Sequence, residues 1–449
     1  MGQPYELLVH QANREIADGH LSPLELLNSV LNQIERTEPR LGAWVFVDID
    51  GARKAASDLS ESMTEGQLLR GIPLGFKDIY DVKGMPTAAG FSPWRDLSAE
   101  RDSKVVSNLR AHGAIILGKT VTTQFAFADP VGTRNPWDSD RTPSGSSTGS
   151  GVAVAARQIP AALGTQTTGS NLRPAAYNGV VGLKPTYGLA STEGILPLAW
   201  SMDHPGILAR CVEDAGLLLD AICQPPQSSA AKGRNRHQVA AREIEPVRFG
   251  IVRDFQEIAI PEVRDNVLEV ARQLEQAGSS VQEISLPTNL ETIKSTHWVI
   301  VLAEAAEVHR ALFESHQEHY APKMRAMMEV AIALPAWAYI RASRFRRKIR
   351  QEVDGLFDQV DCLLSPVSPE LPPLCSEGTT GDYSLLAPWS LLGLPAMSVP
   401  TGLSKSKLPL AVQLAAATGE DEVVLRAAAL CESLFGLMPM PPITRALSD

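Results

Sequence analysis

Apolar residues along the chain recur first at a helical spacing. Near the N-terminus they stand three or four positions apart, at Leu24, Leu27, Val30, Leu31 and Ile34. This spacing predicts an amphipathic helix with one buried face. Ser22, Pro23 and Glu25 precede the first of them, which is the pattern of a capping box with proline in the first turn. We therefore expect the helix to begin at Pro23.

Farther along, short apolar runs between turn residues predict buried strands. Such runs occupy residues 71–76, 114–118, 180–186, 247–252, 280–286, 362–365 and 396–399. Helical patterns alternate with them at 105–109, 151–157, 263–277 and across most of 295–360. This alternation predicts an α/β fold: one large domain with a mixed, twisted central sheet and helices on both faces.

The pattern divides the single domain 1–449 into four parts. Residues 1–65 are expected to form N-terminal helices, and 66–220 carry the motifs discussed below. Residues 224–245 are polar, charged and rich in Ser, Ala and Gln, so they predict an exposed connection. Residues 246–449 are expected to complete the sheet and to supply helices around a substrate pocket.

Net charge and cysteine content indicate which kinds of partner and which cellular compartment to expect. A net charge of −10 argues against nucleic acid or an anionic membrane as the main partner, and no apolar run is long enough to span a bilayer. The first residues lack the pattern of a signal peptide. The cysteines are odd in number and show no CxxC spacing, which favours buried inert thiols in a reducing cytoplasm. They are Cys211, Cys223, Cys362, Cys375 and Cys431.

Three residues carry the candidate chemistry. Ser146 and Ser170 lie 24 positions apart, each in glycine-bearing sequence, and Lys77 follows a predicted strand. Because no histidine lies near them in the sequence, the combination indicates a serine nucleophile with a lysine base. Alternatives stay open, since Ser170 could cap a helix and Lys77 could pair with Asp78.

A lysine base must be neutral to work. With an ordinary pKa of about 10.4, only about one lysine in a few thousand is neutral at pH 7. Burial among apolar side chains lowers that pKa, and the run around Lys77 supplies Ile72, Leu74, Phe76 and Ile79.

His309, His316 and His319 raise the question of a metal. They match no known metal-ligand spacing, and a polar helix face accounts for them better. We expect no metal and no organic cofactor.

Several segments, in order, resemble the amidase signature family of Ser–cisSer–Lys amide hydrolases. The resemblance covers most of the chain and is densest from Gly71 to Leu219. Its segments are Gly71-Ile-Pro-Leu-Gly-Phe-Lys77-Asp, Gly118-Lys-Thr, Thr133-Arg-Asn-Pro, Thr142-Pro, the serine loop 144–151, Gly164-Thr165, Gly169-Ser170, Pro174-Ala175-Ala176, Gly179 to Gly188, Gly393 to Pro400, and Gln413-Leu414.

The resemblance implies a role for each candidate. Ser170 would be the nucleophile, Ser146 a proton relay that follows a cis peptide bond, and Lys77 the base. The substrate would be a small amide, and carbamates, anilides and esters share the same chemistry. Water would complete the reaction, and a homodimer is one assembly left open. The main-chain N–H groups expected to form an oxyanion hole belong to Thr167, Thr168, Gly169 and Ser170.

The serine loop departs from the family pattern. Ser144 and Thr148 stand where the family has glycine, and if either position needs a positive φ, Thr148 would be strained. Ser390 stands where an Asn is expected.

The nucleophile segment departs as well. Gln166 replaces an Asp and Leu172 replaces an Arg, while Arg173 follows one position later. This pattern looks like the malonamidase-type branch, whose arginine holds a substrate carboxylate. The other interpretation is that Arg173 pairs with an internal acid.

Substrate contacts are expected mainly from 295–345 and 376–392. Trp298, Trp337, Tyr339 and Trp389 suggest an apolar or aromatic lining there, and Gln124 is a further candidate contact.

Three other identifications compete. Gly145 to Gly149 also spells the G-x-S-x-G motif of an α/β-hydrolase esterase with Ser147 as nucleophile, but that motif requires a buried strand directly before it. The chain could instead be the A-type subunit of a tRNA-dependent amidotransferase, active only in a complex. An inactive relative is disfavoured because all three catalytic positions are filled.

Overall fold

The first long helix begins where the capping signal places it. In the computed structural model, which describes residues 2–62, 66–223, 236 and 246–445, this helix is α2 (Pro23–Leu41). The Ser22 hydroxyl accepts a hydrogen bond from the Glu25 amide at 3.2 Å, and the Glu25 carboxylate accepts one from the Ser22 amide at 2.8 Å. The helix buries Leu26, Leu27, Val30 and Ile34.

Within the described residues, eleven strands form one mixed sheet in the order β1-β3-β2-β4-β6-β5-β10-β11-β9-β7-β8. Parallel pairs occur in two groups, one joining β2 to β3 and β4, the other joining β7 to β8 and β9. The remaining neighbours pair antiparallel. The strands are β1 (Trp44–Val47), β2 (Pro73–Lys77), β3 (Ile115–Thr120), β4 (Ala161–Gln166), β5 (Val181–Lys184), β6 (His204–Ala209), β7 (Arg248–Val252), β8 (Ser280–Ile284), β9 (Cys362–Pro366), β10 (Ala396–Leu403) and β11 (Pro409–Ala416).

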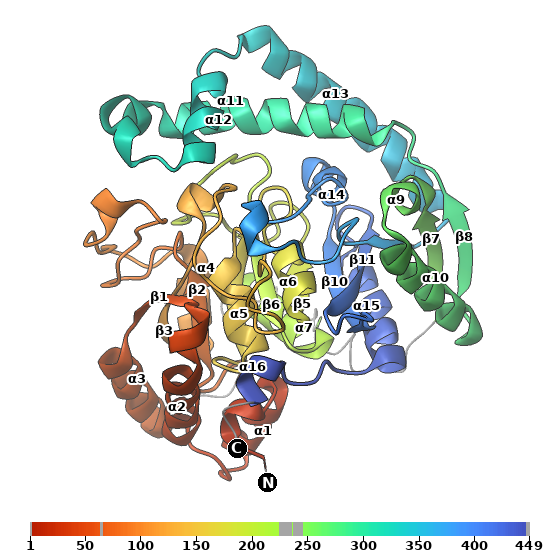
Figure 1. Cartoon of the computed structure of the whole chain (residues 1–449). Helices are drawn as coiled ribbons and strands as arrows, with labels where there is room; N and C mark the ends of the chain where they lie inside the picture. The colour runs from red at the N-terminus through yellow and green to blue at the C-terminus, as the bar shows by residue number, and fades with distance from the viewer. Residues whose placement is uncertain (1, 63–65, 224–235, 237–245, 446–449) are drawn as a thin grey trace.

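Helices cover the sheet (Figure 1). One group, α5 and α6, packs together against the central strands, and a second group of α4, α7, α10 and α15 forms a separate layer. The helices besides α2 are α1 (Val9–Ala17), α3 (Ile49–Ser62), α4 (Lys104–Ala111), α5 (Thr148–Ala155), α6 (Leu172–Asn178), α7 (Val212–Cys223), α9 (Arg253–Ile258), α10 (Pro261–Gln276), α11 (Leu290–His316), α12 (Pro322–Ala331), α13 (Ala336–Asp354), α14 (Ala387–Leu392), α15 (Asp421–Phe435) and α16 (Pro442–Arg445). The predicted α/β class with a single mixed sheet is confirmed.

Helices α11, α12 and α13 lie together across the top of the molecule, above the sheet (Figure 1). They occupy the region 295–360 that the sequence predicts to be helical. Among the described residues, no helix is both long enough and apolar enough to cross a bilayer.

Strands β1, β4, β6 and β11 were not predicted from the sequence. In β4 the sequence Ala161-Ala-Leu-Gly-Thr-Gln166 is rich in small residues, and the neighbouring strands on both sides keep it extended. The strand ends at Gln166, and the backbone is irregular from Thr167 to the start of α6. The predicted connection 224–245 lies outside the described residues except for Arg236, which is buried and pairs with Asp220 at 3.3 Å.

Candidate active site

Lys77 ends strand β2 with its side chain fully buried. Its Nζ donates to the Ser146 hydroxyl and to the Thr165 hydroxyl, each at 2.7 Å. Burial lowers the pKa of the Lys77 ammonium well below its ordinary value, and the negative charge of Asp203 opposes that shift. The amine thus sits where its neutral form is favoured, next to two hydroxyl groups.

The alternative pairing of Lys77 with Asp78 does not occur. Asp78 instead forms a buried ion pair with Lys119, at 3.0 Å. Lys77, the last residue of β2, and Asp78, which follows it, therefore have different partners, and no carboxylate of the described residues is bonded to Lys77.

Ser146 follows the expected cis peptide bond, Gly145–Ser146. Its carbonyl accepts a hydrogen bond from the Thr123 amide at 3.3 Å, and the chain then enters helix α5. The residues before the loop form no strand, so the context that an esterase motif at Ser147 requires is missing. The Ser147 hydroxyl is buried between the carbonyl and the amide of Thr165.

Ser170 lies in the turn between β4 and α6 and is half-buried. Its carbonyl accepts a hydrogen bond from the Ser147 amide at 3.1 Å. This bond brings the two predicted catalytic serines, far apart in sequence, into adjoining backbone beside Lys77.

The segment 167–170 carries the predicted oxyanion-hole amides. Among the described residues, none of its four amide N–H groups donates to another protein atom. Such groups are free to bind an external anion, which is what an oxyanion hole requires.

Gln166 and Ser390, two departures from the family pattern, hold this segment. The Gln166 side-chain oxygen accepts from the amides of Asn171 and Leu172 at 3.1 and 3.0 Å. Its amide nitrogen donates to the Ser390 hydroxyl at 3.1 Å, and that hydroxyl donates to the Thr168 carbonyl at 2.7 Å. A network of uncharged side chains thus holds the segment at the position where the family pattern has an Asp.

Asp203 was missed by sequence reasoning. It is half-buried, and its carboxylate accepts from the Thr167 hydroxyl and from the amides of Leu198 and Ala199. Burial raises the pKa of Asp203. Thr165 was missed in the same way, because only the fold places these groups beside the site.

Ser144 and Thr148, which replace family glycines, behave differently. Ser144 adopts a φ of +70°, a left-handed conformation that favours glycine, whereas Thr148 lies in the first turn of α5. The Thr148 hydroxyl donates to the Ser144 carbonyl at 3.0 Å. The predicted strain therefore falls on Ser144 and not on Thr148.

Arg173 is fully engaged by the protein. Its guanidinium donates to the Ser144 hydroxyl at 2.7 Å, to the Gly145 carbonyl at 3.1 Å, to the Gly381 carbonyl at 2.6 Å and to the Thr380 hydroxyl at 3.1 Å. Burial lowers its pKa, and no carboxylate of the described residues is hydrogen-bonded to it. The expected pairing of Arg173 with an internal acid is therefore not seen there, and Arg173 instead ties the serine loop to the loop at 380–381.

Two of the other residues predicted to contact substrate, Gln124 and Trp389, have their side chains in contact with other parts of the protein. Gln124 uses its amide on the Gly90 and His319 carbonyls and on the Ala321 amide, so it joins two loops. Trp389 is wholly buried against Phe255. Their side chains therefore have structural contacts.

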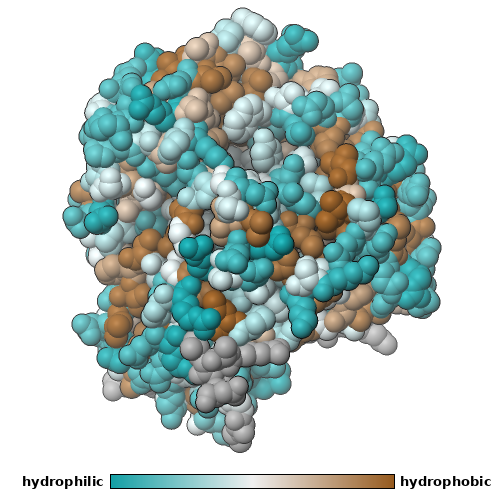
Figure 2. Space-filling model, in the orientation of Figure 1, coloured by the Kyte–Doolittle hydropathy of each residue, from teal (hydrophilic) through white to brown (hydrophobic). Residues whose placement is uncertain are grey.

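The remaining aromatic candidates are divided between surface and site. Trp337, on helix α13, is 65% exposed, and the Tyr339 hydroxyl donates to Glu304. Figure 2 shows apolar side chains gathered at the top of the molecule, where Figure 1 places α11 to α13. Trp298 is half-buried and stacks on Phe127 and Tyr383, with ring centroids 5.9 and 6.5 Å apart. Of the four aromatic residues, Trp298 directly follows His297, whose ring contacts Thr167 and Thr168.

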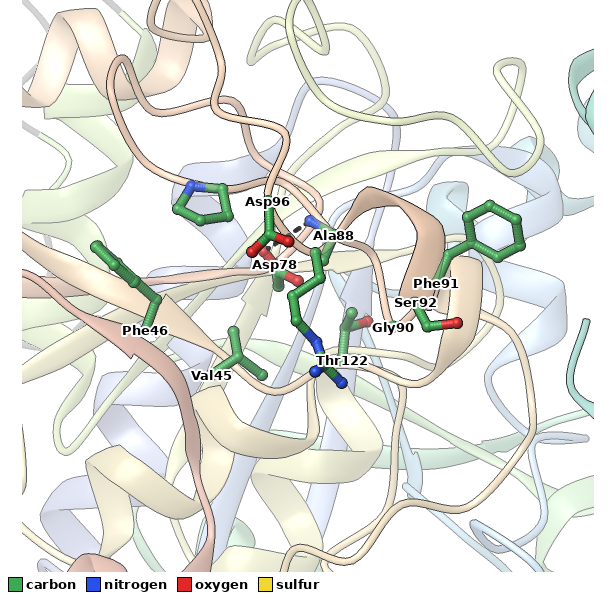
Figure 3. A pocket seen from close by; sticks show the side chains of 11 residues that line it. Val45, Phe46, Asp78, Ala88, Gly90, Phe91, Ser92, Asp96 and Thr122 are labelled. Atoms are coloured by element: carbon green, nitrogen blue, oxygen red, sulfur yellow. Dashed lines mark hydrogen bonds between the residues drawn. The ribbon is translucent and has the colours of Figure 1, made fainter. Parts of the chain in front are cut away.

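A cavity of about 570 Å³ adjoins the site on the side of β1 (Figure 3). Its wall includes Asp78 and Thr122, whose chain neighbours Lys77 and Thr123 contact Ser146. Lys77, Ser146 and Ser170 do not line this cavity.

Potential metal ligands also gather away from the site. Within the described residues, His10, Cys211 and Asp214 bring three ligand atoms within 4.8 Å of one another. The Asp214 carboxylate already accepts from the Val9 and His10 amides and contacts the His10 ring at 2.8 Å, so it docks helix α1 on α7. Of the histidines considered in the sequence, His309 packs on the ring of Phe125 at 4.6 Å.

Comparison with known proteins agrees with this arrangement. The model of the Amidase family matches residues 25–425. The chain is 33% identical to the A-type subunit of the glutamyl-tRNA(Gln) amidotransferase of Thermus thermophilus, with 94% of this chain and 96% of the relative covered. A structure of native peptide amidase from Stenotrophomonas maltophilia superposes with a TM-score of 0.85 at 28% identity, covering 98% of this chain and 100% of that one. An amidase crystal structure gives a TM-score of 0.84 at 33% identity, over 96% and 100% of the two chains. The chain therefore belongs to the amidase signature family.

Proposed function

We propose that this protein is an amidohydrolase that cleaves C–N bonds through an acyl-enzyme on Ser170. The observation that carries the proposal is the buried Lys77 amine, which lies 2.7 Å from the Ser146 hydroxyl and has no bonded carboxylate among the residues that the structure describes. A desolvated neutral amine can accept a proton, which an ordinary exposed lysine at neutral pH cannot do efficiently.

In the proposed cycle, a proton passes from Ser170 to Ser146 as the Ser146 proton passes to Lys77. The Ser170 oxygen bonds to the amide carbon, and amides of the 167–170 segment bind the oxyanion. The C–N bond then breaks, and the relay returns a proton to the leaving amine. Water repeats the same steps to release the acid and free Ser170.

The experiment is to trap the acyl-enzyme. Mixing the protein with a slowly hydrolysed ester or anilide and quenching in acid should add the acyl mass to the peptide that contains Ser170. Ser170→Ala should show no added mass and no turnover. Turnover retained in Ser170→Ala would remove this serine from the mechanism.

On substrate class, we propose neutral amides that carry an apolar group. All three guanidinium nitrogens of Arg173 donate to protein groups. Trp298 stacks on Phe127 and Tyr383 and follows His297, which contacts Thr167 and Thr168. A panel of neutral aryl, neutral alkyl and acidic amides, with carbamates added, tests this. Highest kcat/KM on acidic amides would overturn it.

The relatives favour a second candidate, the A-type component of an amidotransferase complex. The Thermus thermophilus relative with that name aligns over nearly the whole chain. A stand-alone hydrolase should release ammonia or amine from small amides when the purified chain is assayed alone. Turnover that appears only after addition of the other components of such a complex would favour the second candidate.

A further inference from the structure

His297 reaches the 167–170 segment from helix α11. Its side chain is fully buried. Its Nε2 lies 3.3 Å from the Thr167 carbonyl oxygen and 3.2 Å from the Thr168 hydroxyl. The other ring nitrogen, Nδ1, has no hydrogen-bond partner among the described residues.

These contacts define the state of the ring. Because a carbonyl oxygen only accepts, the proton of a neutral His297 must be on Nε2 to bond Thr167. A charged ring would carry a second N–H, on Nδ1, in a buried place that offers no acceptor. Burial accordingly lowers the pKa of His297 to about 4. The ring is therefore a neutral donor at the pH values at which the protein would work.

The bond to Thr167 controls more than one atom. A peptide unit is planar, so the Thr167 carbonyl and the Thr168 amide lie in one plane and point in opposite directions. Fixing the carbonyl therefore also fixes where the Thr168 N–H points. Ser390 does the same for the next peptide, since its hydroxyl donates to the Thr168 carbonyl and thereby orients the Gly169 N–H.

We infer that His297 is a positioning residue that orients the Thr168 amide of the oxyanion hole, as Ser390 orients that of Gly169. The inference rests on the proposed function, because it needs an oxyanion at this segment. It also joins the helix that carries Trp298 to the catalytic backbone, since His297 and Trp298 are neighbours on α11.

The expected effect is on the chemical step. Removing one oxyanion-hole donor outright lowers kcat about 100- to 1,000-fold. A donor that remains but loses its alignment should lower kcat less, by roughly 10- to 100-fold, with KM changed by no more than about twofold.

The test compares His297→Leu, His297→Gln and His309→Leu. Glutamine can place an amide donor near the position of Nε2, so it should restore most of the rate. His309 is the matched control because it lies on the same helix, is equally buried and has a pKa lowered to about 4, yet packs on Phe125. It should keep the wild-type kcat.

The second readout is the affinity of an aldehyde that forms a tetrahedral adduct with Ser170. For His297→Leu it should weaken by the same factor as kcat, while a non-reactive substrate analogue binds as in the wild type. The inference is overturned if His297→Leu keeps kcat, or if His309→Leu loses as much kcat and adduct affinity. It is also overturned if glutamine restores nothing while the variant remains folded by circular dichroism.

Failure of the proposed function looks different. If the wild type forms no acyl-enzyme on Ser170, the mechanism itself is wrong. If it does form one and His297→Leu acylates at the wild-type rate, only the role of His297 is refuted.

Discussion

Replacing Lys77 by methionine should abolish turnover and stabilise the fold at the same time. Holding a lysine neutral at pH 7 against an ordinary pKa of about 10.4 costs the folded state about 4–5 kcal/mol. Methionine has a similar length and no charge to desolvate, so this cost disappears. The substitution also leaves the hydroxyls of Ser146 and Thr165 without their partner. At about 1 kcal/mol each, those losses leave a net gain of about 2–3 kcal/mol.

The gain should depend on pH in a definite direction. Because the pKa of Lys77 is lower in the folded state than in the unfolded state, the unfolded chain binds the proton more tightly. The wild type should therefore gain stability relative to Lys77→Met as the pH rises from 7 toward about 10.4, the ordinary pKa of lysine. Near that pH the advantage of the variant should be gone.

Urea unfolding followed by tryptophan fluorescence at pH 7, 8 and 9.5 measures the difference directly. Effects of pH on other groups cancel between the two proteins. In parallel, kcat/KM of the wild type should rise with pH to a plateau, with its midpoint below the ordinary lysine pKa. The reasoning is refuted if Lys77→Met is no more stable at pH 7 and the difference does not change with pH, since Lys77 would then be charged in the folded protein.

Three further outcomes follow from the site. Ser170→Ala should lose turnover with an unchanged urea midpoint, and a shifted midpoint would show that the half-buried hydroxyl also stabilises the fold. Arg173→Leu should destabilise the protein by about 3–5 kcal/mol, because it leaves several buried acceptors unpaired. It should also reduce activity on acidic and neutral amides alike, and a loss confined to acidic amides would contradict the structural role of Arg173. Ser144→Ala should be less stable than Ser144→Gly by about 1 kcal/mol in the same assay, because only glycine tolerates the φ of +70° without strain; equal stabilities would argue against that strain.

Local signals in the sequence were enough for much of the fold. The capping box at Ser22 and Glu25 contains its own partners within one turn, so the helix start is predictable. The small-residue strand β4 was missed because its extended form is imposed by β2 and β6 on its two sides, and such pairing leaves no periodic pattern in the strand itself.

In the candidate site too, local sequence signals predicted some residues correctly, while contacts with distant segments could not be predicted. Lys77 was found because the chemistry of a serine hydrolase without a nearby histidine needs a base, and the apolar run around it indicated burial. The contacts of Arg173 were not predicted because its acceptors at Thr380 and Gly381 lie more than two hundred positions away in sequence. Trp389 was proposed as a pocket wall because an aromatic side chain fits a pocket and a core equally well, and only the packing against Phe255 separates them.

The uncharged network at Gln166 also constrains how this protein can have diverged from relatives that carry a carboxylate and a guanidinium there. Gln166 and Leu172 are both fully buried, so restoring Asp at the first or Arg at the second would leave a lone charge without its counterpart. Each reversion alone should be deleterious, whereas the two together would supply each other's counter-ion. Such sign epistasis closes the single-step mutational paths between the two arrangements, so a lineage that has crossed to the neutral one tends to stay there.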